Sequence, residues 1–249
     1  MKILLTSTAN GDNSLESCFW PLNKMQNIAD KIASSTSLTT KNNANVLEAG
    51  IDGIVQLLKS NKLTPEIVPN YAKMVFKGRL EVLFASSLGE KEYREKSSDG
   101  YKDALNIASK YYDIVFVDLC KGINNAIAKD ILSIADVVVI NITQSLPMLD
   151  DYIKFSMENL TFDMKKAILS IGRYDIHSKY NVKNVARYIQ SKQNIYAVPY
   201  NTVFYEAMGE GNAAHFFLKY RKVSEKNEHF RFIQEVRKLS EAIIEKLAL

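Results

Sequence analysis

Ile114-Val115-Phe116-Val117-Asp118 and Val137-Val138-Val139-Ile140-Asn141 are two apolar runs rich in β-branched residues, and each ends in a polar side chain. The residues between them, Asn125 to Ala135, have helical spacing. A strand, a crossover helix and a second strand form a βαβ unit, whose parallel strands are buried on both faces and therefore continuously apolar. Ligands of such sheets bind at the carboxyl ends of the strands. The pattern therefore predicts an α/β fold with Asp118 and Asn141 near a ligand site.

The rest of the chain continues this alternation of strands and helices. Further strands are predicted over residues 2–7, 80–84, 166–172 and 195–198. Helices are predicted over residues 25–33, 46–61, 98–112, 145–158, 184–190, 203–220 and 225–247, and one more begins at Thr64-Pro65. Alternation over this length predicts a doubly wound, mostly parallel sheet. Because no linker is visible, we expect a single domain over residues 1–249.

Composition narrows the function classes. The chain has 32 basic and 28 acidic residues and a net charge of +4, which is an ordinary mixed surface and disfavours DNA as a partner. Two cysteines are too few for a disulfide framework and suit a reducing cytoplasm. No apolar run approaches the roughly 20 residues that span a bilayer. We therefore expect a cytoplasmic protein that meets membranes only indirectly.

Several segments resemble a known family of nucleotide-dependent proteins. Tyr111 to Asp118 resembles the strand that carries the second signature acid of the ParA/MinD group of P-loop ATPases, and Ala135 to Asn141 resembles the strand that follows it there. Ser170 to Asp175 and Ala197 to Asn201 are similar to the C-terminal pattern of the TadZ/CpaE-like branch, whose members assist pilus assembly and polar localisation. The resemblance implies a P-loop NTPase-like fold of the SIMIBI type.

The resemblance also implies a set of nucleotide-binding positions. Asp118 corresponds to the acid that holds Mg²⁺, and Lys121 and Gly122 lie in the loop that senses the γ-phosphate in relatives. Asn141 ends the following strand. Gly172, Arg173, Pro199 and Asn201 fall where relatives contact adenine and ribose. The alternative for each residue is ordinary loop chemistry: a carboxylate or amide that accepts nearby backbone N–H groups, a solvated lysine or a turn glycine.

The phosphate-binding element of the family is not visible in this sequence. Relatives hold phosphates on a glycine-rich loop after their first strand, with Lys and Ser or Thr directly after a glycine. None of the ten glycines here is followed by Lys. We matched Lys2 to Ser7 to the family's second strand, which implies that the first strand and first helix are missing. This alignment predicts a gap beside the Asp118 strand, or a rearranged sheet, because an unpaired buried strand edge is costly.

Other chemistry-bearing residues favour structural roles. His177, His215 and His229 are far apart and lack metal-ligand spacing. Cys120 has no evident His partner, and a small buried thiol is the expected role. The last helix has one apolar stripe, but its opposite face mixes acids and bases, so we expect core packing rather than membrane binding.

These observations favour a degenerate or non-catalytic ParA/MinD-like protein. It would act as a cytoplasmic localisation or scaffold factor for pilus or secretion machinery, through protein contacts and recruitment to a cell pole or membrane-bound complex. No cofactor is expected for this chain, although complete relatives use ATP and Mg²⁺. Homodimerisation is a further expectation from the resemblance. The alternative is an ATP-binding ATPase whose phosphate-loop segment is lost by truncation or a wrong start site.

Overall fold

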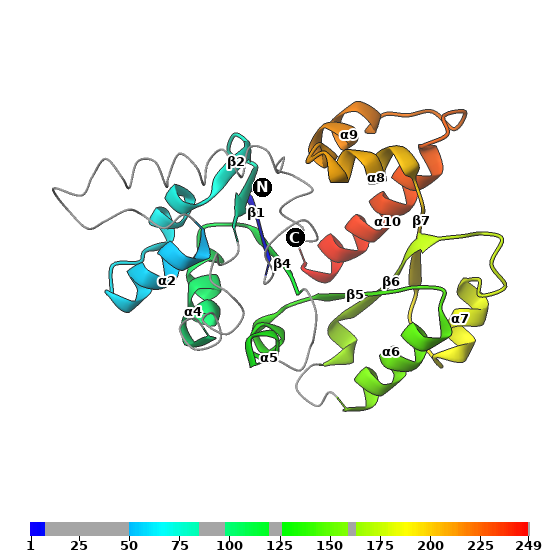
Figure 1. Ribbon diagram of the computed structural model, residues 1–249, viewed down its shortest axis with the longest axis horizontal. Coiled ribbons are helices and arrows are strands. Elements are labelled where there is room, and N and C mark those ends of the chain that lie inside the picture. The colour runs from blue at the N-terminus through cyan, green and yellow to red at the C-terminus, as the bar shows by residue number, and fades with distance from the viewer. Residues whose placement is uncertain (8–49, 85–97, 120–125, 159–162, 249) are drawn as a thin grey trace. The chain divides into compact units, whose positions relative to one another are not determined.

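The computed structural model describes residues 1–7, 50–84, 98–119, 126–158 and 163–248 (Figure 1). They form two compact units, Met1–Asp130 with Glu206–His215 and Ile131–Tyr205 with Phe216–Leu249. The first unit contains a four-stranded sheet of order β2-β3-β1-β4, and the second a three-stranded sheet of order β5-β6-β7. Of the described pairings only β2 with β3 is antiparallel. The prediction of a mostly parallel α/β fold is confirmed, and the single domain stays a prediction.

The sheet of the first unit is centred on β1. Its strands are β1 (Ile3–Ser7), β2 (Lys73–Phe76), β3 (Leu80–Leu83) and β4 (Ile114–Asp118). β1 pairs in parallel with β3 on one side and with β4 on the other. Leu4, Leu5 and Thr6 are consecutive and all buried, as expected of a central strand covered on both faces.

The pairing of β4 bears on the missing strand that the sequence predicts. β1, which we matched to the family's second strand, lies against β4 in a continuous register from Ile3 opposite Ile114 to Ser7 opposite Asp118. β4 is the last strand of this sheet, and among the described residues no strand pairs with its other edge. The gap that the sequence predicts beside the Asp118 strand therefore stays a prediction.

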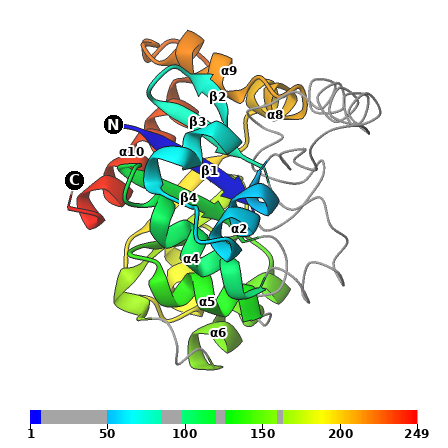
Figure 2. The same ribbon diagram turned by 90° about the vertical axis from the view of Figure 1, so that its left-hand side faces the viewer.

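Two helices, α2 (Ile51–Lys59) and α4 (Ser98–Ala108), pack against each other in the first unit. Figure 2 shows them in front of β1 and β4. An added Cβ on Gly100 would lie 2.9 Å from a methyl carbon of Val55, so glycine permits the close helix contact. Gly50 precedes α2 at φ 86°, and its Cβ would lie 2.5 Å from the carbonyl oxygen of Phe84. Only glycine fits at this start of α2, where the backbone passes close to Phe84, the residue that follows β3.

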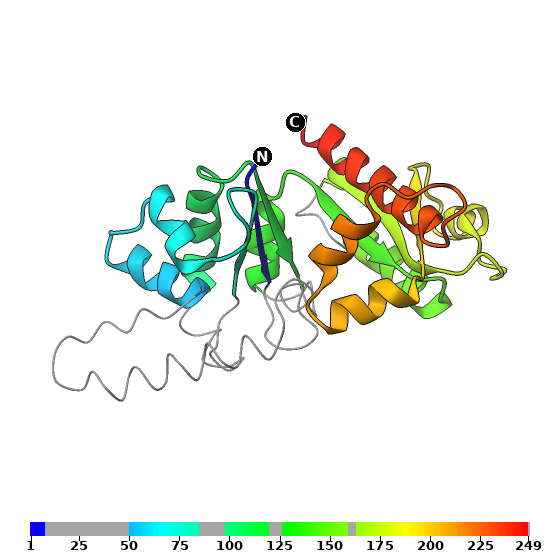
Figure 3. The ribbon, with the colours of Figure 1, turned by 90° about the horizontal axis from the view of Figure 1, so that it is seen from above.

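The second unit has three layers. Its sheet consists of β5 (Val138–Ile142), β6 (Ala167–Tyr174) and β7 (Ile195–Pro199). The helices α6 (Leu146–Glu158) and α7 (Val182–Tyr188) pack on β5 and β7, while α10 (Phe230–Lys246) packs along β6 and β7. Figure 3 shows α10 on one face of these strands and α7 on the other. The apolar stripe of the last helix therefore serves core packing.

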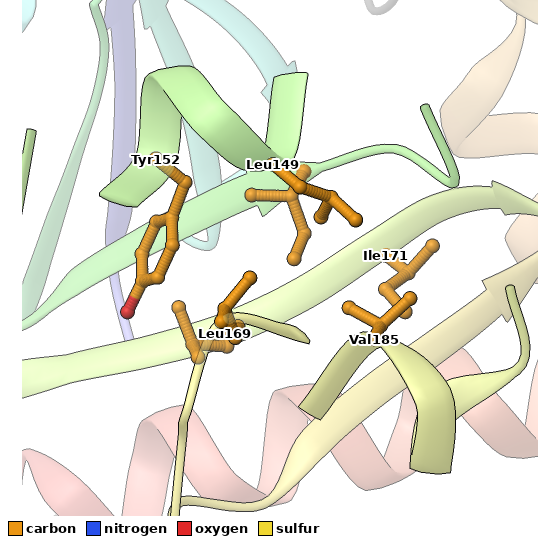
Figure 4. Close-up of a cluster of buried hydrophobic side chains, with 7 residues drawn as sticks. Leu149, Tyr152, Leu169, Ile171 and Val185 are labelled. Atoms are coloured by element: carbon orange, nitrogen blue, oxygen red, sulfur yellow. The ribbon is translucent and has the colours of Figure 1, made fainter. Parts of the chain in front are cut away.

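A cluster of buried aliphatic side chains and one tyrosine joins α6 and α7 to the sheet. Figure 4 shows Leu149 and Tyr152 from α6 pointing toward Leu169 of β6, with Ile171 of β6 near Val185 of α7. Leu149, Leu169, Ile171 and Val185 are each 0% exposed. Burying such a side chain contributes roughly 1.5–3 kcal/mol, so this cluster is a main source of stability in the second unit.

The remaining elements are short. They are α5 (Ala126–Ile134), α8 (Thr202–Gly209), α9 (Ala213–Tyr220) and two 3₁₀ helices, Pro65–Tyr71 and Met164–Lys166. The helix predicted over residues 203–220 is divided in two, and Gly211 at φ 68° lies in the break. The helix predicted over residues 25–33 lies outside the described residues. No helix within the described ranges is long and apolar enough to cross a membrane.

Candidate functional site

In the first unit, the carboxyl edge of the sheet is formed by the ends of β1 and β4. Asp118 is the last residue of β4, is half-buried and lies opposite Ser7. Asp118 therefore ends its strand at the edge where ligands of parallel sheets bind, as the sequence predicts. Lys121, Gly122 and Cys120 lie outside the described residues, so their predicted roles stay predictions.

The polar end of β1 is partly used for packing. Thr6 is 0% exposed, and its hydroxyl lies 3.4 Å from the hydroxyl of Tyr101 in α4. This contact links the central strand to the helix layer. At the other end of the neighbouring strands, Tyr112 donates a hydrogen bond to the Glu81 carboxylate. Burial is the larger cause that raises the pKa of Tyr112 far above its ordinary value, and the hydrogen bond to Glu81 adds to it. The phenol therefore stays neutral.

In the second unit, a bulge shapes the carboxyl edge. The register of β6 with β7 shifts between Ile171 and Tyr174, and Arg173 within this bulge has φ 52°. A left-handed backbone is uncommon for arginine and often marks a special site. The guanidinium of Arg173 lies 5.4 Å from the ring centre of Tyr205 in a cation–π contact. Gly172 has open space where a side chain would be.

Asn141 and Pro199 lie at the same edge as the bulge. Asn141 is exposed in β5 and lies opposite Ser170, and Pro199 ends β7 opposite Tyr174. The structure therefore brings together five of the predicted positions in this unit, namely Asn141, Gly172, Arg173, Pro199 and Asn201. Asp118 belongs to the first unit, and each edge is described by itself.

Asn201 has a structural function that its sequence position only partly predicts. Its Oδ1 accepts the backbone N–H of Phe204 and so caps α8 at 2.8 Å. This orientation points Nδ2 at the Nδ1 atom of His229, 3.0 Å away. Because the amide donates, His229 Nδ1 must accept and Nε2 carries the proton. Both ends of the Asn201 amide are thus engaged within the protein.

His229 is the residue that sequence reasoning missed at this edge. It is 5% exposed and packs edge-on against Tyr220, with ring centres 4.4 Å apart. Its partner Asn201 is 28 residues away in sequence, so no local pattern indicates the contact. His177 and His215 are exposed. Within the described ranges, no group of three or more His, Cys, Asp or Glu side chains could hold a metal ion.

Gln144 organises the loop that follows the bulge. Its Oε1 accepts the backbone N–H of Asp175 at 2.7 Å, and its Nε2 donates to the carbonyls of Asp175 and Tyr180 at 3.0 and 2.8 Å. Gln144 lies two residues after β5, where parallel sheets place ligand-binding side chains. That position is the feature of the sequence that could have marked Gln144 as a candidate site residue. The side chain instead supports the protein's own backbone.

The comparisons with known proteins find relatives at the level of structure. No family model matches the sequence, and no curated protein matches it. A crystal structure of a ParA family ATPase from Chlorobium tepidum aligns with a TM-score of 0.68 at 14% identity, covering 100% of this chain and 87% of that one.

Two MinD structures align as well. MinD from Pyrococcus horikoshii, complexed with Mg-ADP, has a TM-score of 0.58 at 13% identity and covers 97% of this chain and 83% of its own. The MinC:MinD cell division complex of Aquifex aeolicus has a TM-score of 0.56 at 15% identity, with coverages of 96% and 84%. At these identities the likeness concerns the fold, and this chain has the fold of the ParA and MinD ATPases.

Proposed function

We propose that this chain is a non-catalytic, degenerate ParA/MinD-like protein that acts through protein contacts. In this proposal it is a cytoplasmic localisation or scaffold factor for pilus or secretion machinery. It hydrolyses no ATP, and it reaches a cell pole or a membrane only by way of a partner protein. The pilus connection rests on the resemblance of Ser170–Asp175 and Ala197–Asn201 to the TadZ/CpaE-like pattern.

The observation that carries the proposal is that Asp118 ends β4 at the carboxyl edge of its sheet, while the sequence contains no phosphate loop of the family's kind. None of the ten glycines is followed by lysine. The segment that follows β1, the strand paired with β4, is Thr8-Ala9-Asn10-Gly11-Asp12-Asn13-Ser14, which has one glycine and no lysine. Binding of Mg-ATP by this family needs a lysine and backbone donors around the phosphates. In this proposal the chain therefore lacks the groups that would hold the phosphates.

A residue of the second unit supports the same conclusion. Asn201 falls where relatives contact the nucleotide base, yet its amide caps α8 and donates to His229. A base would have to displace one of these hydrogen bonds, leaving a buried group without a partner at a cost of about 1–3 kcal/mol. Asp118 remains suited to a Mg²⁺ ion, but a single acid without a phosphate cradle supplies little binding energy.

A thermal shift experiment tests the absence of nucleotide binding. We expect 2 mM Mg-ATP to leave the melting temperature of the full chain unchanged within about 1 °C. A ligand present at 100 times its Kd would add about 2.7 kcal/mol and raise the melting temperature by several degrees. Asp118→Asn is the matched control because it removes the charge and keeps the shape. A rise of several degrees in the wild type that disappears in Asp118→Asn would overturn the proposal.

The alternative of an ATP-binding ATPase has its own test. It is favoured by the position of Asp118 and by the Mg-ADP-bound MinD structure of the same fold. Reading the DNA in frame upstream of Met1 would reveal a glycine-rich strand–loop–helix if the start site were wrong. Finding such a segment, together with Mg-ATP hydrolysis by the extended protein, would replace the scaffold proposal with the ATPase.

Affinity purification from the native cells tests the partner class. We expect a tagged full chain to recover a pilus or secretion component, and a fluorescent fusion to lose its polar focus when that component is deleted. Recovery of division or partition proteins in its place would refute the pilus assignment. Light scattering of the purified chain tests the proposed homodimer, which should form without added nucleotide.

A further inference from the structure

A hollow lies at the amino-terminal edge of the second unit's sheet, opposite the edge described above. It forms where the start of β6, the start of β7 and the end of α10 meet, and its volume is about 690 Å³. Pockets for small organic ligands in proteins measure about 300–1,000 Å³. Ala167 of β6 and Ala242 of α10 line it, and their short side chains leave the space between helix and sheet open.

Three lysines converge on this hollow from three separate segments. Lys165 belongs to the 3₁₀ helix before β6, Lys192 to the turn before β7, and Lys246 to the last turn of α10. The ammonium groups of Lys165 and Lys192 have no hydrogen bond or ion pair among the residues that the structure describes. Lys246 donates to the carbonyl of Ala167 at 3.2 Å, a contact that also suits the negative end of the helix.

The segments that carry the lysines are held in place. The side-chain Nε2 of Gln193 donates to the carbonyl of Met164 at 3.0 Å and so ties the Lys192 turn to the Lys165 helix. The Asp163 carboxylate accepts the backbone N–H of Lys165 at 2.9 Å and caps the 3₁₀ helix. The cations therefore project from an ordered frame, and a ligand would not have to organise the backbone.

The charge of the hollow selects an anion. Three lysines face one glutamate, Glu245, which leaves an excess of two positive charges. Lysine binds anions as a point charge, whereas arginine forms two parallel hydrogen bonds to a carboxylate or a phosphate, and no arginine lines this hollow. A phosphate monoester, which carries nearly two charges at neutral pH, matches this excess.

The remaining lining residues favour a phosphate that carries an organic group. Tyr196 and Ala242, which are partly exposed, supply most of the apolar surface beside the lysines, since Ala167 and Ile168 are only 2% and 5% exposed. Inorganic phosphate would leave this surface in contact with water. An organic group attached to the phosphate would cover it and add binding energy in proportion to the apolar area buried.

We propose that this lysine pocket, lined by Lys165, Lys192, Lys246, Glu245, Tyr196 and Ala242, binds a small organic phosphate. The ligand's phosphate lies between the lysines and its organic part rests on Ala242 and Tyr196. The same phosphate chemistry occurs in free metabolites and in lipid headgroups. The proposal stands independently of whether the chain handles ATP, because the pocket lies at the other edge of the sheet.

Calorimetric titration of the full chain with phenyl phosphate tests the pocket. We expect sub-millimolar binding that is at least several-fold tighter than that of inorganic phosphate. The double variant Lys165→Gln, Lys192→Gln should weaken it about tenfold or more, since each hydrogen bond to a charged group counts strongly. Lys183→Gln together with Lys154→Gln is the matched control, because it removes the same charge from exposed positions outside the pocket.

Several results would overturn the proposal. If the control pair weakened the binding of phenyl phosphate as much as the pocket pair, the effect would come from the overall charge of the protein. If inorganic phosphate and phenyl phosphate bound equally tightly, the proposed subsite for the organic group would be refuted. Vesicles containing phosphatidic acid, whose headgroup is a phosphate monoester, distinguish the two sources of ligand. Vesicle binding that phenyl phosphate displaces, and that the pocket variant loses, would assign a lipid headgroup. Vesicle binding that neither treatment alters, without binding of phenyl phosphate, would refute the pocket.

Discussion

At the carboxyl edge of β5, β6 and β7, the polar side chains of Gln144 and Asn201 bond to the protein itself. At the amino edge of β6 and β7, Lys165 and Lys192 project into an open hollow and have no partner among the described residues. The fold alone points to the first edge as the ligand edge. The difference teaches that position in a fold marks where a ligand can bind, whereas unsatisfied charge marks where binding energy is still available.

Among the changes at the carboxyl edge of the second unit's sheet, Asn201→Ala should destabilise the protein most. The change removes the α8 cap, worth about 0.5–2 kcal/mol, and leaves the buried His229 nitrogen without its donor. We expect a loss of about 2–3 kcal/mol in the free energy of unfolding, measured by urea denaturation. Asn201→Asp keeps the capping oxygen and should lose about half as much. A loss below about 0.5 kcal/mol for Asn201→Ala would show that the amide is free for a ligand after all.

Gln144→Ala should loosen the same edge by a smaller amount. Three hydrogen bonds to Asp175 and Tyr180 disappear, but this loop is partly exposed and water replaces some of them. We expect a loss of about 1–2 kcal/mol and faster hydrogen exchange at the Asp175 amide. Gln144→Glu retains the acceptor for that amide, so its exchange should remain slow. Fast exchange in both variants would contradict the bridging role.

Tyr152 provides a pH test of the core between the two edges. Burial raises the pKa of Tyr152 above its ordinary value near 10, because the phenolate is disfavoured in the α6 cluster. Its contribution to stability is fully present below pH 10 and is lost as the pH rises through the folded-state value. The free energy of unfolding of Tyr152→Phe should therefore decline less steeply than that of the wild type between pH 9.5 and 11. Parallel declines of the two proteins would place the titration elsewhere.

The lysine pocket should show the smallest effect on stability. Lys192→Gln removes a charge with no partner among the described residues, so the free energy of unfolding should change by less than about 0.5 kcal/mol. Lys246→Gln removes the hydrogen bond to Ala167 and should cost about 0.5–1 kcal/mol. Denaturation of both variants measures this contrast. A loss above 1 kcal/mol for Lys192→Gln would mean that the lysine is structural, and the two edges would no longer differ.

Local sequence was sufficient for most elements of the fold. β4 and β7 were predicted almost to the residue, because buried parallel strands are continuously apolar. β2 was missed, since its four residues include Met74, which is 54% exposed, and its antiparallel pairing with β3 leaves little pattern. The break between α8 and α9 had a local signal in Gly209-Glu210-Gly211 that the helical spacing outweighed.

The candidate site was predictable only as a set of positions. The sequence placed Asp118, Asn141, Arg173 and Asn201 at strand ends, and they lie there. Their roles depend on partners distant in the chain. Asn201 is committed to His229, 28 residues away, and Gln144 to Asp175, 31 residues away. Such partners are set by side-chain packing, which no local spacing encodes.

The sequence by itself determined that this protein is a parallel α/β chain and that the loop after Ser7 has no lysine beside its glycine. Both are local properties, of apolar runs and of residue identity. Only the tertiary structure decided that β1 lies between β3 and β4. Only it brought Lys165, Lys192 and Lys246 to one hollow. Strand order and convergent charges arise from contacts between distant segments, where many arrangements satisfy the same local pattern.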